Sequence, residues 1–215
     1  MLVSMWMTRD LVTAGPDTPI HDAAVLMARH GVHRLPVVSG EGNDQRLVGI
    51  VSATDIIRAY PPDVNPFAIE TLETDQTPTT VAEIMKHNPV TTTTETPVEE
   101  AAILMSERKI SALPVLRNET LAGIITESDI FRGFASLFSA EGQGARITFD
   151  ATKGEDIFSL VAQFAQRDRV QVDSLITTRQ HNRPVCIVRV SGPRVEKMLD
   201  DLWRSGHLVL SVLRS

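Results

Sequence analysis

The stretch Gly49-Ile50-Val51-Ser52-Ala53-Thr54-Asp55 occurs a second time as Gly123-Ile124-Ile125-Thr126-Glu127-Ser128-Asp129, 74 residues further along the chain. In both copies a short apolar strand runs into a hydroxyl residue and an aspartate. We expect a helix to begin after Asp55 and, by the repetition, after Asp129. Internal self-similarity of this kind indicates two copies of one structural unit.

The repetition extends upstream at an offset of 78 residues. The segment from Pro19 to Met27 matches the segment from Pro97 to Met105, with Pro, Ala-Ala, Leu and Met in register. In each copy an isoleucine or valine, two alanines and a methionine are spaced as one face of a helix. Leu35-Pro36-Val37 likewise matches Leu113-Pro114-Val115. The change of offset falls between Val38 and Leu47, in a segment typical of a turn, where a shared fold tolerates a change of length.

Each copy therefore predicts a β-α-β-β-α unit of about 55 residues, which is too small to bury its sheet alone. Two units packed sheet to sheet would leave two clefts related by a pseudo-twofold axis. The predicted boundaries are 1–60 and 81–138. Residues 61–80 between them contain four prolines and no Lys or Arg, so they indicate a solvated linker more than a regulatory surface.

The last third of the chain changes pattern. Four strand-like segments (146–149, 170–177, 184–190 and 208–213) alternate with two helical faces in the order βαββαβ, which is the ferredoxin-like arrangement. We therefore predict a third domain over 145–215, and an α+β fold class for the whole chain.

Composition excludes several classes of protein. Of 215 residues, 42% are hydrophobic and 22% charged, as in an ordinary globular protein, and the net charge of −6 disfavours a general nucleic-acid binder. Because no apolar run is long enough to span a membrane and the N-terminus does not resemble a signal peptide, we expect a cytoplasmic protein. One cysteine, Cys186, rules out an internal disulfide framework, and with six scattered histidines it offers no zinc cluster, so we expect no metal. Its apolar neighbours indicate a buried core thiol.

These repeated motifs resemble those of the CBS family, and the pair resembles a Bateman module over about residues 1–135. The resemblance implies that an adenosine-containing ligand, such as AMP, ADP, ATP or S-adenosylmethionine, binds in the clefts. In the first copy it places the ligand against Thr13, His33, Arg34, Leu35, Pro36, Ser52, Thr54 and Asp55. In the second copy it places the ligand against Thr91, Ala112, Leu113, Pro114, Thr126, Ser128 and Asp129.

The chemistry of these positions agrees with a nucleotide. Asp55 or Asp129 can accept hydrogen bonds from both ribose hydroxyls. Thr54 or Ser128 can donate to a phosphate, Arg34 can pair with it bidentately, and His33 adds a donor. We expect the Leu-Pro steps to sandwich a purine.

Each assignment has a simpler alternative. Hydroxyl and aspartate residues before a helix are ordinary N-caps, and His33-Arg34 can be a solvated pair at a strand edge. Thr91–Thr94 contains no glycine, so it indicates a polar strand entry more than a phosphate cradle. Ser111-Ala112 replaces the basic pair in the second copy, which predicts unequal clefts.

A βαββαβ domain behind a CBS pair resembles an ACT-type domain, as in CBS–ACT proteins of the acetoin-utilisation type. This resemblance implies an amino-acid-binding loop, here Asp150, Lys153 and Gly154, and a homodimer. The loop departs from the family pattern because it lacks a proline and its acid lies one residue too far from Gly154.

Taken together, the sequence predicts a regulatory sensor that binds an adenine nucleotide, forms a homodimer and acts on an unidentified effector protein, with no catalytic residues and no cofactor. It contains no Gly-rich phosphate loop, G-x-S-x-G or H-E-x-x-H motif, which disfavours an enzyme. Two alternatives remain open: a structural dimerisation module whose clefts bind nothing, and an amino-acid-responsive regulator acting through the ACT-like domain.

Overall fold

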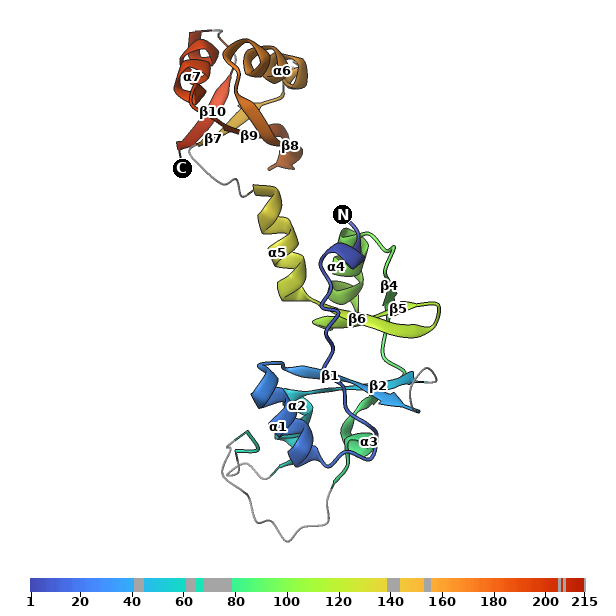
Figure 1. Cartoon of the computed structure of the whole chain (residues 1–215). Helices are drawn as coiled ribbons and strands as arrows, with labels where there is room; N and C mark the ends of the chain where they lie inside the picture. The colour runs from blue at the N-terminus through green and yellow to red at the C-terminus, as the bar shows by residue number, and fades with distance from the viewer. Residues whose placement is uncertain are drawn as a thin grey trace. The chain divides into compact units, whose positions relative to one another are not determined.

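The computed structural model describes residues 1–40, 45–60, 65–67, 79–138, 144–152, 156–204, 206 and 208–214. The chain divides into two compact units, Met1–Phe131 and Arg132–Ser215 (Figure 1). Most of the predicted linker lies outside the described residues. No helix in the described part of the chain is long and apolar enough to cross a membrane.

The first repeat contains helix α1 (Ile20–His30), strands β1 (Arg34–Ser39) and β2 (Arg46–Ser52), and helix α2 (Ala53–Ala59). Helix α1 buries the predicted face, including Ala23, Ala24 and Met27, and ends at Gly31, whose φ of 62° is the left-handed conformation that glycine adopts readily. β1 and β2 pair antiparallel. The predicted leading strand is reduced to a single parallel bridge between Ala14 and Val37.

The second repeat follows the same order. Its elements are β4 (Thr92–Thr93), α4 (Val98–Arg108), β5 (Ala112–Arg117), β6 (Thr120–Thr126) and α5 (Glu127–Phe138). β4 runs parallel to β5, and β5 pairs antiparallel with β6. The predicted β-α-β-β-α order is therefore confirmed here, with a leading strand of two residues.

The expectation that a helix begins after Asp55, at Ile56, is wrong by three residues. Helix α2 begins at Ala53, because Ser52 caps it: the Ser52 hydroxyl accepts a hydrogen bond from the Asp55 amide at 3.3 Å, and Asp55 Oδ2 accepts one from the Ser52 amide at 2.9 Å. This reciprocal capping box satisfies two backbone donors at the helix start. Helix α5 likewise begins at Glu127, before Asp129.

The repeats exchange their leading segments, which the predicted boundaries 1–60 and 81–138 did not anticipate. The N-terminal segment, dark blue in Figure 1, contains the short helix η1 (Val3–Met5) and lies beside the second repeat. Its Val3 amide donates to Thr96 O at 2.9 Å, and Val3 and Met7 are buried in the second core. Helix α3 (Val81–Ile84) and strand β3 (Lys86–His87) in turn complete the first repeat, where Val81 and Met85 join the core and β3 pairs with β2.

A glycine receives each exchanged segment. A Cβ placed on Gly49 would collide with Met85 Sδ, and one placed on Gly123 would lie 2.9 Å from Met7 Sδ and 2.8 Å from the Thr8 carbonyl oxygen. Neither position has room for a side chain. The two strand glycines are therefore needed for this close approach.

We expect Gly123→Ala to lower the free energy of unfolding by about 1–3 kcal/mol, since the added methyl meets a backbone oxygen that cannot rotate away. Urea unfolding followed by circular dichroism measures it. Gly15→Ala is the matched control, because its nearest atom would be Thr18 Oγ1 at 3.6 Å. Equal stabilities of the two variants would contradict the packing argument.

The C-terminal unit contains β7 (Gly144–Asp150), α6 (Ile157–Asp168), β8 (Gln171–Gln180), β9 (Arg183–Ser191), α7 (Val195–Arg204) and β10 (Val209–Arg214). This is the predicted order βαββαβ. The strands form one antiparallel sheet in the order β10-β7-β9-β8. The two βαβ halves therefore interlock, since β9 lies between β7 and β8.

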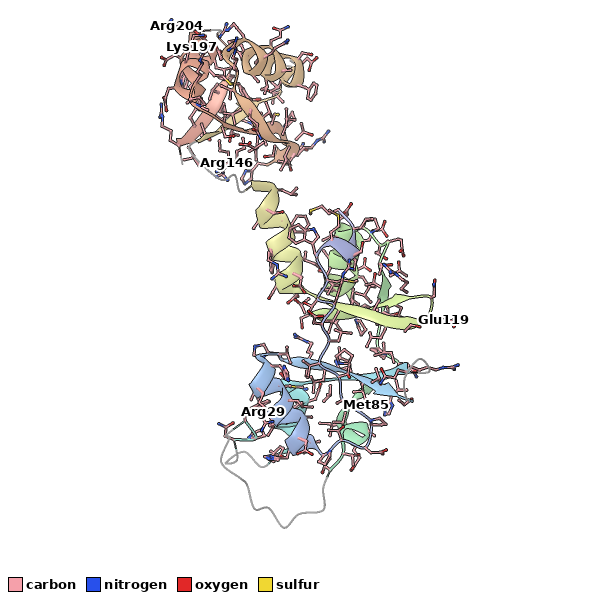
Figure 2. The ribbon with its side chains drawn as sticks, viewed as in Figure 1. Arg29, Met85, Glu119, Arg146, Lys197 and Arg204 are labelled. Atoms are coloured by element: carbon pink, nitrogen blue, oxygen red, sulfur yellow. The ribbon has the colours of Figure 1, made fainter. Side chains whose placement is uncertain are left out.

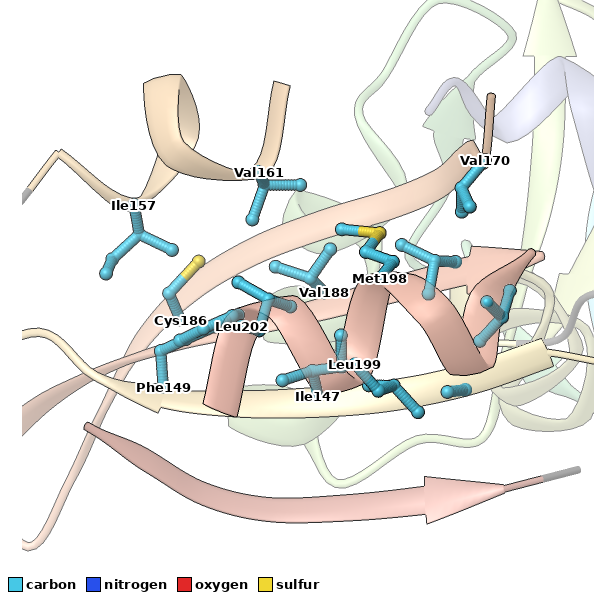
Figure 3. Close-up of a cluster of buried hydrophobic side chains, with 13 residues drawn as sticks. Ile147, Phe149, Ile157, Val161, Val170, Cys186, Val188, Met198, Leu199 and Leu202 are labelled. Atoms are coloured by element: carbon cyan, nitrogen blue, oxygen red, sulfur yellow. The ribbon is translucent and has the colours of Figure 1, made fainter. Parts of the chain in front are cut away.

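Both helices of this unit pack on one face of its sheet. Figure 3 shows Ile147 and Phe149 of β7 meeting Leu199 and Leu202 of α7 in the core. Cys186 is buried in the same cluster, as predicted, and its burial raises the pKa of the thiol, which opposes a reactive thiolate.

A buried carboxylate joins the two helices. Asp168, at the end of α6, is fully buried and accepts hydrogen bonds from Arg167 at 2.9 Å and from Lys197 of α7. The hydrogen bond from Arg167, followed by that from Lys197, holds the pKa of Asp168 below its ordinary value. Because the native state then binds the proton less tightly than the unfolded state, the carboxylate stabilises the fold above the unfolded pKa of about 3.9.

We expect Asp168→Asn to lower the free energy of unfolding by about 1–2 kcal/mol at pH 7, because charge-assisted hydrogen bonds are lost while the two cations remain in solvent. The difference from the wild type should shrink as the pH falls below about 4, where Asp168 itself becomes protonated. Denaturant unfolding at pH 7, 5, 4 and 3 measures this. A difference that stays constant over that range would contradict the assignment.

Candidate functional site

A pocket of about 360 Å³ lies between the two repeats of the N-terminal unit. Three segments form its wall. The first repeat contributes Arg34, Ile50, Ser52, Thr54, Asp55 and Arg58, the exchanged segment contributes residues from Lys86 to Val90, and the turn from α4 to β5 contributes residues from Lys109 to Ala112. Its size is at the lower end of the range for small-molecule sites.

The carboxylate of Asp55 is held in place by the cap of α2. Its Oδ2 accepts hydrogen bonds from both the amide of Ser52, at 2.9 Å, and the hydroxyl of Ser52, at 2.5 Å. Among the described residues, Oδ1 of Asp55 has no hydrogen-bond partner. The capping interpretation and the ligand interpretation of the sequence are therefore compatible, since one oxygen caps the helix and the other remains available to a ligand.

Arg34 connects the two repeats at this pocket. Its guanidinium, at the start of β1, donates a hydrogen bond to the Ser111 hydroxyl, just before β5. Arg34 is half-buried, so it is not the solvated pair member that the alternative interpretation required. Ser111, which stands in the second repeat where the first repeat has His33, thus accepts a hydrogen bond from Arg34 of the first repeat.

The exchanged segment supplies the pocket wall that the sequence interpretation missed. Met85, labelled in Figure 2, is anchored beside α3, and the chain then runs through β3 into the pocket. Asn88 has a φ of 47°, a left-handed conformation in which asparagine is enriched, and this residue turns the chain after β3. The exchange of leading segments thus brings Lys86 and His87 to the pocket. The spacing of the repeats in the sequence does not indicate this placement.

The pocket is rich in cationic side chains. Arg34, Arg58, Lys86 and Lys109 line it with His87, whereas Asp55 is the one carboxylate among the described lining residues. Of these cations, the sequence analysis identified Arg34 alone. Lys109 could have been identified from the sequence, because it replaces Gly31 at the C-cap of the equivalent helix and adopts a φ of 52° there.

The second predicted cleft differs from the first. Asp129 is 5% exposed, and its Oδ2 accepts hydrogen bonds from the Thr126 amide at 2.8 Å and hydroxyl at 2.7 Å. Thr126, Ser128 and Asp129 do not line the pocket that contains Asp55. Asp129 is therefore capped in the same way as Asp55 but does not line the same pocket.

The predicted purine sandwich does not form. Leu35 and Leu113 are 0% exposed in the two hydrophobic cores, since strand alternation turns them inward. Pro36 and Pro114 are also buried, and His33 is exposed outside the pocket. Of the residues predicted for the ligand, the pocket brings together Arg34, Ser52, Thr54, Asp55 and Ala112.

Two further hollows contain the predicted threonines. Thr91 lines one of about 460 Å³ that shares Asn88 and Pro89 with the main pocket. Thr13 lines another hollow, with Arg9, Val38 and Leu121, and this hollow shares no described residue with the pocket that contains Asp55. Of these two hollows, the one at Thr91 therefore adjoins the pocket that contains Asp55.

The predicted amino-acid loop can be followed in part. Asp150 ends β7, and its Oδ1 accepts a hydrogen bond from the Thr152 amide at 2.8 Å. Lys153 and Gly154 lie outside the described residues. Within the described ranges, no group of three or more His, Cys, Asp or Glu residues is placed to hold a metal.

Comparison with known proteins identifies the repeats. The sequence model of the CBS domain matches residues 3–62 and 81–136. An uncharacterised protein of Methanocaldococcus jannaschii, MJ1225, is 37% identical over 139 residues, which are 62% of this chain and 47% of MJ1225. A CBS domain-containing protein of Dictyostelium discoideum is 36% identical over 135 residues, 60% of this chain and 88% of that protein. This chain thus spans about half the length of MJ1225.

Solved structures agree with this match. The CBS pair of MJ0100, in complex with 5′-methylthioadenosine and S-adenosyl-L-methionine, superposes with a TM-score of 0.51 at 32% identity, over 63% of this chain and 96% of that one. CBSX2 in complex with AMP superposes with a TM-score of 0.52 at 27% identity, over 64% of this chain and 98% of that one. Since the sequence model covers more than half of the residues, this chain belongs to the CBS domain family, as a tandem CBS pair followed by a βαββαβ unit.

Proposed function

We propose that the chain is a regulatory sensor that binds an adenosine-containing ligand in the pocket between its CBS repeats, with Asp55 as the ribose contact. The observation that carries the proposal is the position of Asp55, whose Oδ2 is fixed by Ser52 while its carboxylate lines the pocket. A fixed carboxylate is suited to accept hydrogen bonds from the two hydroxyls of a ribose. The complexes of MJ0100 and CBSX2 with adenosine compounds support this ligand class.

Regulation requires that the ligand favour one arrangement of the repeats over another, because equal affinity for both shifts nothing. The pocket wall comes from both repeats, and Arg34 spans them through Ser111. A ligand that binds the Arg34 guanidinium would break its hydrogen bond to Ser111 and replace it with a contact between Arg34 and the ligand. We propose that an effector protein responds to that change.

We expect Asp55→Ala to weaken AMP or ATP binding by about 1.5–3 kcal/mol, the contribution of hydrogen bonds to a charged group, which is roughly ten- to hundredfold in Kd. Isothermal titration calorimetry with AMP, ATP and S-adenosylmethionine measures it. Asp129→Ala is the matched control, because Asp129 also accepts two hydrogen bonds from its cap residue but does not line the pocket. Loss of binding in Asp129→Ala alone would place the ligand in the other cleft and overturn the assignment.

We also propose that the βαββαβ unit is a ferredoxin-like, ACT-like domain that holds the chain as a homodimer. Its edge strand β10 carries Leu210 and Leu213, which are 50% and 53% exposed. An exposed apolar edge strand favours pairing with another chain.

Light scattering at micromolar concentration should give twice the formula mass of 23.6 kDa. We expect Leu213→Glu to reduce the dimer fraction, because it places a charge on the apolar edge. Ile103→Glu is the control, since Ile103 is 57% exposed on α4 in the other unit. A wild-type monomer would rule out the homodimer, and dissociation by the control variant alone would move the interface to the CBS pair.

A further inference from the structure

We propose that the ligand of this pocket carries a chain of two or more phosphates, so that an adenosine di- or triphosphate binds better than a monophosphate or an adenosyl thioether. The adenosine part of this ligand rests on the proposed function. The phosphate part rests on the charge of the pocket wall, which can be tested separately.

Each wall of the pocket contributes a cation. Arg34 and Arg58 come from the first repeat, Lys86 from the exchanged segment, and Lys109 from the second repeat. His87 adds a further hydrogen-bonding side chain beside Lys86. Because the cations lie on separate segments, an anion in the pocket is approached from more than one side.

The pocket is lined by several cationic residues although the N-terminal unit as a whole has an excess of acidic residues. Residues 1–131 contain nine Lys and Arg against eighteen Asp and Glu, yet four of the nine line this one pocket. Asp55 is the single carboxylate among its described lining residues. A cleft with one sign of charge raises the local concentration of ligands of the opposite sign.

The fold itself does not impose the charge. At the offsets of the repeat, Lys86 corresponds to Thr8, Lys109 to Gly31 and Arg34 to Ala112. The equivalent positions of the second cleft, Thr8, Gly31 and Ala112, therefore carry none of these three cations, although the strands, the helices and the capped aspartate are repeated. We therefore attribute these three cations to the ligand that the first pocket binds, and not to the requirements of the fold.

The charge of the ligand then decides among adenosine compounds. S-adenosylmethionine carries a sulfonium and an ammonium against one carboxylate, so four cations repel it. A single terminal phosphate carries about −1.5 to −2 charges and provides three acceptor oxygens. Each additional phosphate supplies further acceptors for charge-assisted hydrogen bonds, which match four cationic groups on three segments better than one phosphate does.

The test is a series of titrations of the full chain with adenosine, AMP, ADP, ATP, S-adenosylmethionine and inorganic pyrophosphate, in buffer with a chelator so that no divalent cation masks the phosphates. We expect ADP and ATP to bind at least tenfold more tightly than AMP, with an advantage that falls as salt is raised. Lys86→Gln and Lys109→Gln should each weaken ADP binding at least fivefold and leave adenosine binding within twofold. Arg117→Gln is the control for lost charge, since Arg117 is exposed at the end of β5 and outside the pocket.

The outcomes separate this inference from the proposed function. Equal affinities for AMP, ADP and ATP, or tighter binding of S-adenosylmethionine, would overturn the phosphate inference while leaving an adenosine site at Asp55. Pyrophosphate that binds as tightly as ADP and depends on Lys86 would uphold the phosphate inference and remove the adenosine assignment. An equal effect of Arg117→Gln would show that net charge acts from a distance, and it would overturn the pocket assignment.

Discussion

Two methionine–glycine contacts determine how the N-terminal unit is assembled. Met85 lies over Gly49 in the first repeat, and Met7 lies over Gly123 in the second, at separations that leave no room for a Cβ. Each methionine belongs to the segment that precedes the other repeat. A single repeat cannot complete its own core, so neither half of the unit reaches its final packing without the other.

The same contacts also shape the pocket. Because Met85 is anchored in the first core, the chain that follows it must leave along β3 and pass between the repeats before it reaches β4. Lys86, His87 and Asn88 therefore line the pocket as a consequence of core packing. The capped Asp55 is fixed from the other side by the start of α2. A shift of one core relative to the other would therefore move the residues that line the pocket and change its shape.

Much of the fold was predictable because its signals are local. Helical spacing identified α1 and α4, and the duplicated strand motif identified β2 and β6. The exchange of leading segments was not predictable, since the offset that carries Met7 to Met85 is the same whichever core each methionine enters. For the same reason Lys86 was missed, although Asp55 and Arg34 were found from their motifs. The leucines of the Leu-Pro steps were misassigned, because the side of the strand they occupy depends on the pairing register with β2 and β6.

The uneven charge of the two clefts has a consequence for signalling, on the proposal that the ligand is anionic. Lys109 of the second repeat lines the same small pocket as Arg34, Arg58 and Lys86, where Asp55 is the one carboxylate among the described lining residues. Like charges in that arrangement repel one another and oppose close approach of the repeats. An anionic ligand neutralises this repulsion and also contacts both repeats. It therefore favours the arrangement in which the repeats lie close together by more than its hydrogen bonds alone would. A neutral ligand of the same shape would supply the contacts and leave the repulsion in place, and it would therefore bind without shifting the arrangement to the same extent.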